Sequence, residues 1–122
     1  MKKVLDVGQC GPDHSAIRHF LQTHFDVEIQ RTSLPADTLA ALRRQPFDLV
    51  LINRKLDEDY SDGLEILKAI KQDPDIGQTP VMLVTNYAEH QAESVAAGGE
   101  QGFGKNDLRH AKTAELLKPF LG

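Results

Sequence analysis

The chain has one cysteine, Cys10, and no tryptophan, and aromatic residues make up only 6% of its 122 residues. A single cysteine excludes a disulfide within the chain. No apolar run approaches the ~20 residues that a membrane-spanning helix needs. The first apolar run is interrupted by Asp6 and is too short for the hydrophobic region of a signal peptide. We therefore expect a cytoplasmic protein that does not enter a membrane.

Excess positive charge is also missing. The formal net charge is −4, and no block of basic residues stands out along the chain. Proteins that bind nucleic acids or anionic membrane surfaces concentrate lysine and arginine on one face. The sequence therefore predicts neither nucleic acid nor a membrane as a partner.

What is present is sufficient for one hydrophobic core. Hydrophobic residues make up 40% of the chain, and charged residues, at 26%, are too few and too interspersed to indicate disorder. A length of 122 residues is usual for one domain and short for two independent cores. We expect residues 1–122 to form a single domain without linkers or internal repeats.

Short apolar runs alternate with segments of helical period, which is typical of repeated strand–helix units. Strands are expected at residues 4–7, 27–29, 49–52 and 81–84, with a weaker fifth at 102–104. The runs LVLI at 49–52 and VMLV at 81–84 contain no polar alternation. Strands of a parallel sheet have this composition because helices cover both faces.

The segments between these runs carry helix signals. Ile17, Phe20 and Leu21 form one apolar stripe, and Pro35 suits a first helical turn. Asp62 and Asn86 are each followed three residues later by glutamate, which predicts two N-terminal caps.

Glycine and proline predict where the later helices end. Gly98 is expected to close the fourth helix, because glycine adopts left-handed backbone conformations readily. The last helix is expected from about Asp107 to Leu117. Pro119 is expected to end or kink it, because proline has no N–H to donate.

Five strand–helix units joined by right-handed crossovers predict an open, doubly wound parallel sheet with helices on both faces. In such α/β sheets, ligands bind at the carboxyl ends of the strands. The polar and small residues expected there are Gly8, Gln9, Cys10, Asn53, Thr85, Asn86 and Lys105.

Two segments then give the chain a family resemblance. The first is FDLVLIN at 47–53, followed by DGLEIL at 62–67, and the second is TPVMLVT at 79–85, followed by AAGG at 96–99 and Lys105. In this order and spacing the chain resembles the receiver domains of two-component response regulators. The resemblance implies the flavodoxin-like (CheY-like) α/β fold, with five parallel strands in the order 2-1-3-4-5.

The resemblance also implies a set of site positions. In that family an acidic pair after the first strand holds Mg²⁺, and an aspartate ending the third strand accepts a phosphoryl group from a histidine kinase. A serine or threonine and a lysine contact that phosphoryl group, and an aromatic residue on the fifth strand responds to it. The corresponding positions here are Gly8 and Gln9 for the acidic pair, Asn53 for the phosphoacceptor, Thr85 and Lys105 for the phosphoryl contacts, and Gly102 for the aromatic residue.

These differences predict that the phosphorylation chemistry is lost. The amide of Asn53 is neutral and a poor nucleophile. Mg²⁺ prefers anionic oxygens, whereas Gly8 has no side chain and Gln9 offers a neutral carbonyl. We therefore expect a degenerate pseudo-receiver that is not an enzyme and holds no metal or cofactor. Restoring aspartate at 8, 9 and 53 together is expected to return metal binding.

The first functional interpretation is a phosphorylation-independent protein-interaction module in signalling. By position in the family, its interface with a signalling partner or a second copy would comprise Tyr87–Ala97, Gln101–Gly104 and Asp107–Leu117. The alternative is a sensor that binds an anion or a phosphorylated metabolite at the strand ends. An enzyme of another flavodoxin-like class is a third possibility, although no GxGxxG or GxxxxGK phosphate loop is present.

Two charged residues need partners in this scheme. Lys105 lacks the family's carboxylates, so we expect it to pair with Asp6 or Asp57, or to reach water, because a buried unpaired ammonium is costly. Asp6 is unusual in the middle of a strand. We expect it to be partly exposed or hydrogen-bonded, or to stand in for a missing acid.

Cysteine and histidine offer no metal or redox chemistry in this pattern. Cys10 has no basic neighbour in the sequence and is expected to be an ordinary thiol. Histidines 14, 19 and 24 are five residues apart, which scatters them around a helix, so we do not expect them to bind metal. His90 and His110 are expected to be solvated.

Overall fold

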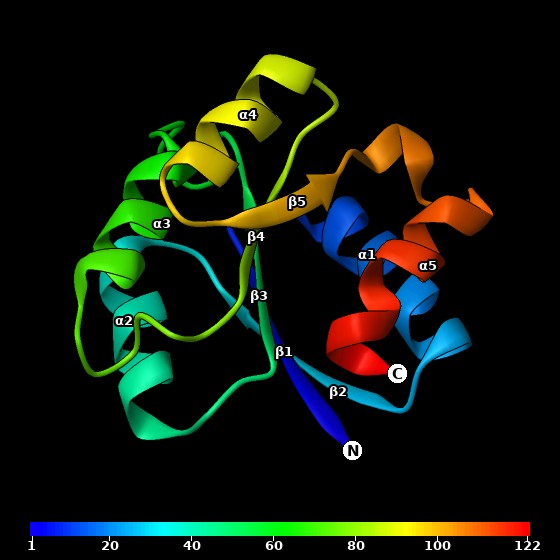
Figure 1. The fold of residues 1–122 in the computed structure, drawn as a ribbon, viewed down its shortest axis with the longest axis horizontal. Helices are drawn as coiled ribbons and strands as arrows, with labels where there is room; N and C mark the ends of the chain where they lie inside the picture. The colour runs from blue at the N-terminus through cyan, green and yellow to red at the C-terminus, as the bar shows by residue number, and fades with distance from the viewer.

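Strands and helices alternate along the chain in the computed structural model, which describes residues 1–122 (Figure 1). The strands are β1 (Lys2–Val7), β2 (Val27–Thr32), β3 (Leu49–Asn53), β4 (Val81–Val84) and β5 (Glu100–Phe103). The helices are α1 (Gly11–His24), α2 (Pro35–Arg44), α3 (Gly63–Gln72), α4 (Ala88–Ala96) and α5 (Ala111–Leu121), with a 3-10 turn η1 at Lys105–Asp107 before α5. Each expected strand and helix is present.

The five strands form one parallel sheet in the order β2-β1-β3-β4-β5, which confirms the expected topology. β1 is central and pairs with both β2 and β3. Because all strands run in the same direction, the residues that follow β1, β3 and β4 lie at one edge of the sheet (Figure 1).

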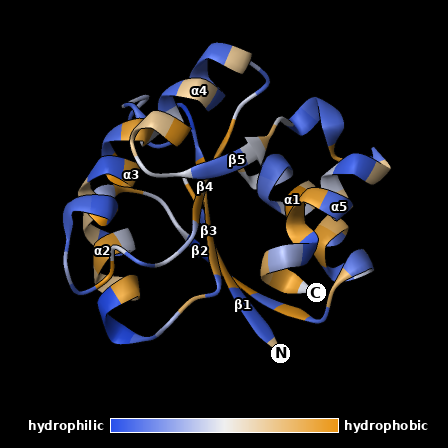
Figure 2. Ribbon diagram, viewed as in Figure 1, coloured by the Kyte–Doolittle hydropathy of each residue, from blue (hydrophilic) through white to orange (hydrophobic).

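Helices cover both faces of the sheet, and each face has its own core. Leu5, Val50 and Leu83 face α2 and α3, whereas Val4, Leu49 and Met82 face α1 and α5. All six side chains are fully buried, which explains why the central strands are apolar at every position. In Figure 2 the hydrophobic colour follows the strands and the helix sides that face them.

Asp62 begins α3 as expected, with its carboxylate accepting a 2.9 Å hydrogen bond from the Leu64 N–H. The prediction for Asn86 was wrong, because Tyr87 is the residue before α4 and no side chain caps this helix. The Asn86 side-chain oxygen instead accepts a hydrogen bond from the Asn106 N–H at 3.1 Å. Its amide therefore holds the turn after β5.

Gly98 ends α4 with a φ of 103°, as predicted. The last helix differs from the prediction, because η1 precedes it and it runs from Ala111 to Leu121 with Pro119 inside. Pro119 lies in the final turn, where its missing N–H removes little hydrogen bonding, and buried Leu117 and Leu121 hold that turn on the core. None of the helices has the length and apolar character that a bilayer span needs.

Candidate functional site

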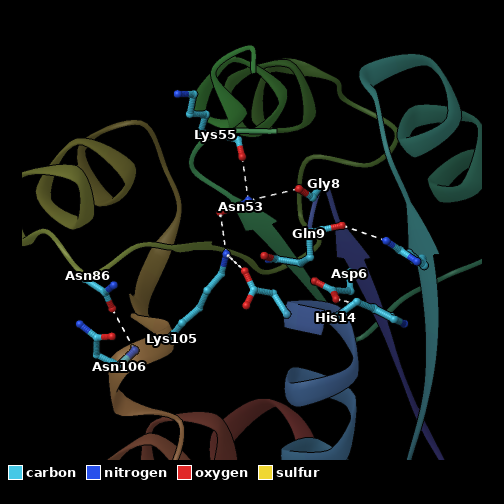
Figure 3. A network of polar contacts seen from close by, with 11 residues as sticks. Asp6, Gly8, Gln9, His14, Asn53, Lys55, Asn86, Lys105 and Asn106 are labelled. Atoms are coloured by element: carbon cyan, nitrogen blue, oxygen red, sulfur yellow. Dashed lines mark hydrogen bonds and ion pairs between the residues drawn. The ribbon is translucent and has the colours of Figure 1, made fainter. Parts of the chain in front are cut away.

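Asn53 is the last residue of β3, the strand between β1 and β4, and lies between Gly8 and Lys105 (Figure 3). Its side-chain amide nitrogen donates to the carbonyl oxygens of Gly8, at 3.2 Å, and Lys55, at 2.7 Å. Its side-chain oxygen accepts from the Lys105 ammonium at 3.4 Å. Both ends of the amide are therefore occupied by groups of the chain itself.

Lys105 is paired, but not with the residues that the sequence suggested. Its Nζ lies 2.7 Å from Oδ2 of Asp13, in the first turn of α1, and the hydrogen bond from Lys105 lowers the pKa of this carboxyl group. Asp6 and Asp57 make no ion pair with Lys105. The expectation of a paired ammonium is confirmed, and the named partners were wrong because only the tertiary structure brings α1 to the end of β5.

Gly8 and Gln9 follow β1 and present no carboxylate. Gly8 has a φ of 76°, and a Cβ at this position would overlap the side chain of Leu56. The Gln9 side chain is only 3% exposed, and neither of its amide atoms has a hydrogen-bond partner. Figure 3 shows this side chain pointing toward Lys105. Its backbone carbonyl accepts from the Arg31 guanidinium at 3.0 Å.

Asp6 is fully buried in the middle of β1. Its Oδ2 lies 2.6 Å from Nδ1 of His14 in α1, and its Oδ1 has no partner. Burial raises the pKa of Asp6, and the hydrogen bond from His14 offsets part of this effect. The hydrogen-bonded carboxylate was expected, but partial exposure was wrong. The sequence analysis considered His14 only as a metal ligand and missed it as the partner of Asp6, although a mid-strand acid before a helix signals that a partner is needed.

Thr85 follows β4 and is buried beside the same edge of the sheet. Its hydroxyl lies 3.1 Å from Nδ1 of His90 in α4, so the prediction that His90 is solvated was wrong. His90 is half-buried and its ring meets the Tyr87 ring edge-on, with centroids 5.2 Å apart. A pocket of about 320 Å³ is lined by these residues together with Asn53 and Lys105. His110, in contrast, has a side chain that is 63% exposed, as expected.

Gly102 in β5 is bound to a side chain that the sequence analysis also missed. Gln91 of α4 is buried, and its side-chain oxygen accepts from the Gly102 N–H at 2.8 Å. The Gln91 amide nitrogen donates to the Leu83 carbonyl of β4 at 2.9 Å. A Cβ at Gly102 would overlap that same carbonyl oxygen. Gln91 therefore joins α4 to both β4 and β5.

The polar groups at this edge do not form a metal centre. No three histidine, cysteine, aspartate or glutamate side chains converge where they could hold a metal ion. Cys10 is a free, partly exposed thiol at the start of α1. The structure thus brings Gly8, Gln9, Asn53, Thr85 and Lys105 to one edge of the sheet and adds Asp13, His14, His90 and Gln91 to their surroundings.

Comparison with known proteins gives a consistent result. The family model for the response regulator receiver domain matches residues 13–106. The polar-differentiation response regulator DivK of Brucella ovis is 29% identical over 96 residues, covering 78% of this chain and 76% of DivK.

Solved structures agree in fold. The signal receiver domain of a DNA-binding response regulator from Colwellia psychrerythraea superposes with a TM-score of 0.80 at 22% identity, covering 98% of this chain and 97% of that one. The chemotaxis response regulator CheY4 of Vibrio cholerae has a TM-score of 0.71 at 22% identity, covering 98% and 94%. Both show the same doubly wound arrangement.

Proposed function

The chain belongs to the response regulator receiver family, and we propose that residues 1–122 form a single cytoplasmic pseudo-receiver domain that signals through protein contacts without being phosphorylated. Receiver domains are signalling modules that interact with partner proteins, and no catalytic activity is indicated for this chain.

The main support for this proposal is that an asparagine, Asn53, occupies the position that we assign to the phosphoacceptor and that its side chain is fully hydrogen-bonded. Phosphoryl transfer needs a nucleophilic oxygen with an available lone pair, and an amide oxygen is neutral and weakly nucleophilic. The Asn53 amide is also engaged at both ends, by Gly8 and Lys55 on the nitrogen and by Lys105 on the oxygen. Asn53 is therefore better suited to hold a fixed hydrogen-bond network than to accept a phosphoryl group.

The residues present do not fit the Mg²⁺ ion of the family. Mg²⁺ requires several oxygen ligands in near-octahedral geometry, usually including carboxylates. Here Gly8 supplies no side chain and Gln9 a neutral amide. The nearest carboxylate to Lys105 is Asp13, which already binds that ammonium at 2.7 Å. The Lys105 cation also contacts the Asn53 oxygen, where a metal would need a ligand.

The surroundings of Gly102 support a domain that does not switch through an aromatic residue on β5. Gln91 bridges β4 and β5 from α4, with both of its amide ends bound to backbone groups. Buried hydrogen bonds of this kind are costly to leave unmade, so they favour one position of α4. We infer that α4 stays in a single arrangement that partners recognise directly.

The amphipathic pattern of α4 supports this surface as the interface. Its buried residues are polar, Gln91 and Ser94, while its small apolar residues are exposed. Val95 is 47% exposed and Tyr87, just before the helix, is 61% exposed. An aromatic and an aliphatic residue that remain exposed on an ordered helix suit a protein contact. We therefore retain the α4–β5–α5 face, now at 88–96, 100–103 and 111–121, as the proposed interface.

Anion sensing at the strand ends is the less favoured function. Its expected anchor, Lys105, already binds Asp13. The guanidinium of Arg54, which lines the same pocket, is paired with the carboxylate of Asp62 at 2.9 Å. An anion would have to compete with these carboxylates for the available positive charge. None of the comparisons favours this alternative.

The direct test is incubation of the protein with Mg²⁺ and acetyl phosphate, followed by intact-mass measurement and by a calorimetric Mg²⁺ titration. We expect no phosphoryl adduct and no saturable Mg²⁺ binding. An acid-labile adduct that maps to the strand-end site of the unaltered chain would overturn the proposal. The same assay on a phosphorylatable receiver serves as the positive control.

A further inference from the structure

A second hollow of the molecule, larger than the one at the strand ends, lies elsewhere on the surface. It has a volume of about 640 Å³ and lies between the outer side of α1 and the turn that follows η1. The strand-end pocket is about half as large, at 320 Å³. A volume of this size is within the range of small-molecule sites, which is roughly 300–1,000 Å³.

The floor of this groove is apolar and fixed in place. Phe20 is only 8% exposed and belongs to the core between the sheet, α1 and α5. Its ring packs on that of His24, with centroids 4.8 Å apart. Ala16 of α1 and Leu108 of the turn complete the apolar lining. Because core packing holds Phe20, the groove exists before any ligand arrives.

The groove is lined by basic side chains and by no acidic ones. Its charged or titratable lining residues are Arg109, His19 and His24, and no carboxylate lines it. The chain as a whole carries 18 acidic and 14 basic residues, so this absence of acid is local. Arg109 is exposed and takes part in none of the ion pairs or side-chain hydrogen bonds of the structure. Its guanidinium is free to bind an anion.

We propose that this groove binds a small amphipathic carboxylate, with an aliphatic or aromatic body on the apolar floor and its carboxylate at Arg109. A guanidinium matches a carboxylate with two parallel hydrogen bonds, which fixes the orientation of the ligand. The body of the ligand covers Ala16 and Leu108, and the exposed edge of Phe20, from water. His19 and His24 border the groove and can donate further hydrogen bonds.

The position of the groove allows a bound ligand to influence the strand-end site. Its two walls are α1 and the turn after η1, and the Asp13–Lys105 ion pair joins α1 to η1, the segment that leads directly into that turn. A ligand that contacts both walls adds a second connection between them and stabilises the state in which that ion pair is formed. The groove thus supplies an input to the domain that needs no phosphoryl group. Binding itself does not depend on the proposed function.

Decanoate is a suitable probe, used below its micellar concentration, with decanol as the uncharged match. We expect saturable shifts of the backbone amide signals of residues 15–24 and 108–109 in two-dimensional ¹⁵N–¹H spectra. Arg109→Gln is expected to weaken decanoate binding at least tenfold and to leave decanol binding unchanged. Ala16→Glu, which places a carboxylate on the floor, is expected to abolish decanoate binding.

The matched control is Arg44→Gln, because Arg44 is exposed and unpaired on α2, outside the groove. It is expected to bind decanoate like the unaltered chain. Shifts that rise linearly without saturation, or equal effects of the Arg44 and Arg109 substitutions, would overturn the groove assignment. This assay contains no phosphodonor, so a phosphorylated wild-type chain would end the pseudo-receiver proposal without changing the result for the groove.

Discussion

Lys105 and Asp13 are 92 residues apart in the sequence, and their Nζ and Oδ2 atoms lie 2.7 Å apart. The pair joins η1, after the last strand, to the first turn of α1. Its side chains are 27% and 40% exposed, so the pair is partly shielded from water. It neutralises Lys105, the lysine that we assign to the family's phosphoryl contact, with a carboxylate from a different element.

Asp13→Asn is expected to lower the free energy of unfolding by about 0.5–1 kcal/mol at neutral pH, the upper range for partly exposed pairs. Lys105 lowers the pKa of Asp13 in the folded chain. The contribution of the pair is therefore present above the unfolded pKa, about 3.9, and is lost as the pH falls through the lower folded value. Urea unfolding of both proteins from about pH 7 to about pH 3 measures this.

The matched control is Glu115→Gln, which removes the carboxylate from the exposed Lys118–Glu115 pair. We expect it to change stability by less than about 0.5 kcal/mol. A loss for Asp13→Asn that stays constant down to about pH 3 would show that its effect is not electrostatic.

Asn53→Asp alone is not expected to restore phosphorylation by acetyl phosphate. One carboxylate beside Gly8 and Gln9 still leaves Mg²⁺ without enough anionic ligands. It would also lose the two hydrogen bonds that the Asn53 amide nitrogen donates to Gly8 and Lys55. Intact mass after incubation with the phosphodonor is the measurement, and rapid labelling of this single variant would contradict the argument.

The triple change at positions 8, 9 and 53 is harder than the sequence suggested. Gly8 has a φ of 76°, and a Cβ there would overlap Leu56, so Gly8→Asp is expected to cost about 1–3 kcal/mol of stability. Gln9→Asp, at an ordinary backbone position, is the matched single variant. Unfolding midpoints of the two single variants and Mg²⁺ titration of the triple variant test this. A Gly8→Asp protein as stable as the unaltered chain would contradict it.

Gln91→Leu is expected to destabilise the domain by about 1–3 kcal/mol, because it leaves the Gly102 N–H and the Leu83 carbonyl buried without partners. Glu93→Gln, on the exposed side of the same helix, is the control and is expected to change stability by less than about 0.5 kcal/mol. Amide hydrogen exchange should show α4 opening more readily in the first variant alone. Equal exchange in both proteins would mean that Gln91 does not hold α4.

Asp6→Asn is expected to change the pH dependence of stability. Burial raises the pKa of Asp6 in the folded chain, so the folded state binds this proton more tightly than the unfolded state. The resulting stabilisation is complete below the unfolded pKa, about 3.9, and is lost as the pH rises through the folded pKa. The stability of the variant relative to the unaltered chain should therefore increase as the pH rises from about 4 toward neutral. A relative stability independent of pH, in parallel urea titrations, would contradict this.

The fold was predictable because burial on both faces of a parallel sheet leaves few choices of residue. Val50 and Leu51 face opposite helix layers and are both fully buried, so the strand must be apolar throughout. The helices were predictable from apolar residues at helical spacing, such as Ile17, Phe20 and Leu21 of α1. Their ends were less predictable, because Asn86 and Pro119 carry local signals that tertiary contacts overrode.

The sequence also predicted which residues lie at the strand ends, but it did not predict which side chains they contact. Gly8, Asn53 and Lys105 reach one edge because parallel strands end together. Which carboxylate pairs with Lys105 depends on the direction in which the first turn of α1 points, and no sequence pattern encodes that. Gln91 was missed for a similar reason, since a buried glutamine on a surface helix is visible only once its backbone partners are placed.

The central position of β1 has a consequence for folding during synthesis, because its neighbours in the sheet are synthesised after it. β1 leaves the ribosome first, yet one of its two neighbours, β3, follows some forty residues later, as residues 2–7 and 49–53 show. The core on the α1 side is completed only by α5, the last helix, through Leu117 and Leu121. A nascent chain released before α5 would leave this core incomplete, and apolar surface exposed in this way favours aggregation and recognition by chaperones.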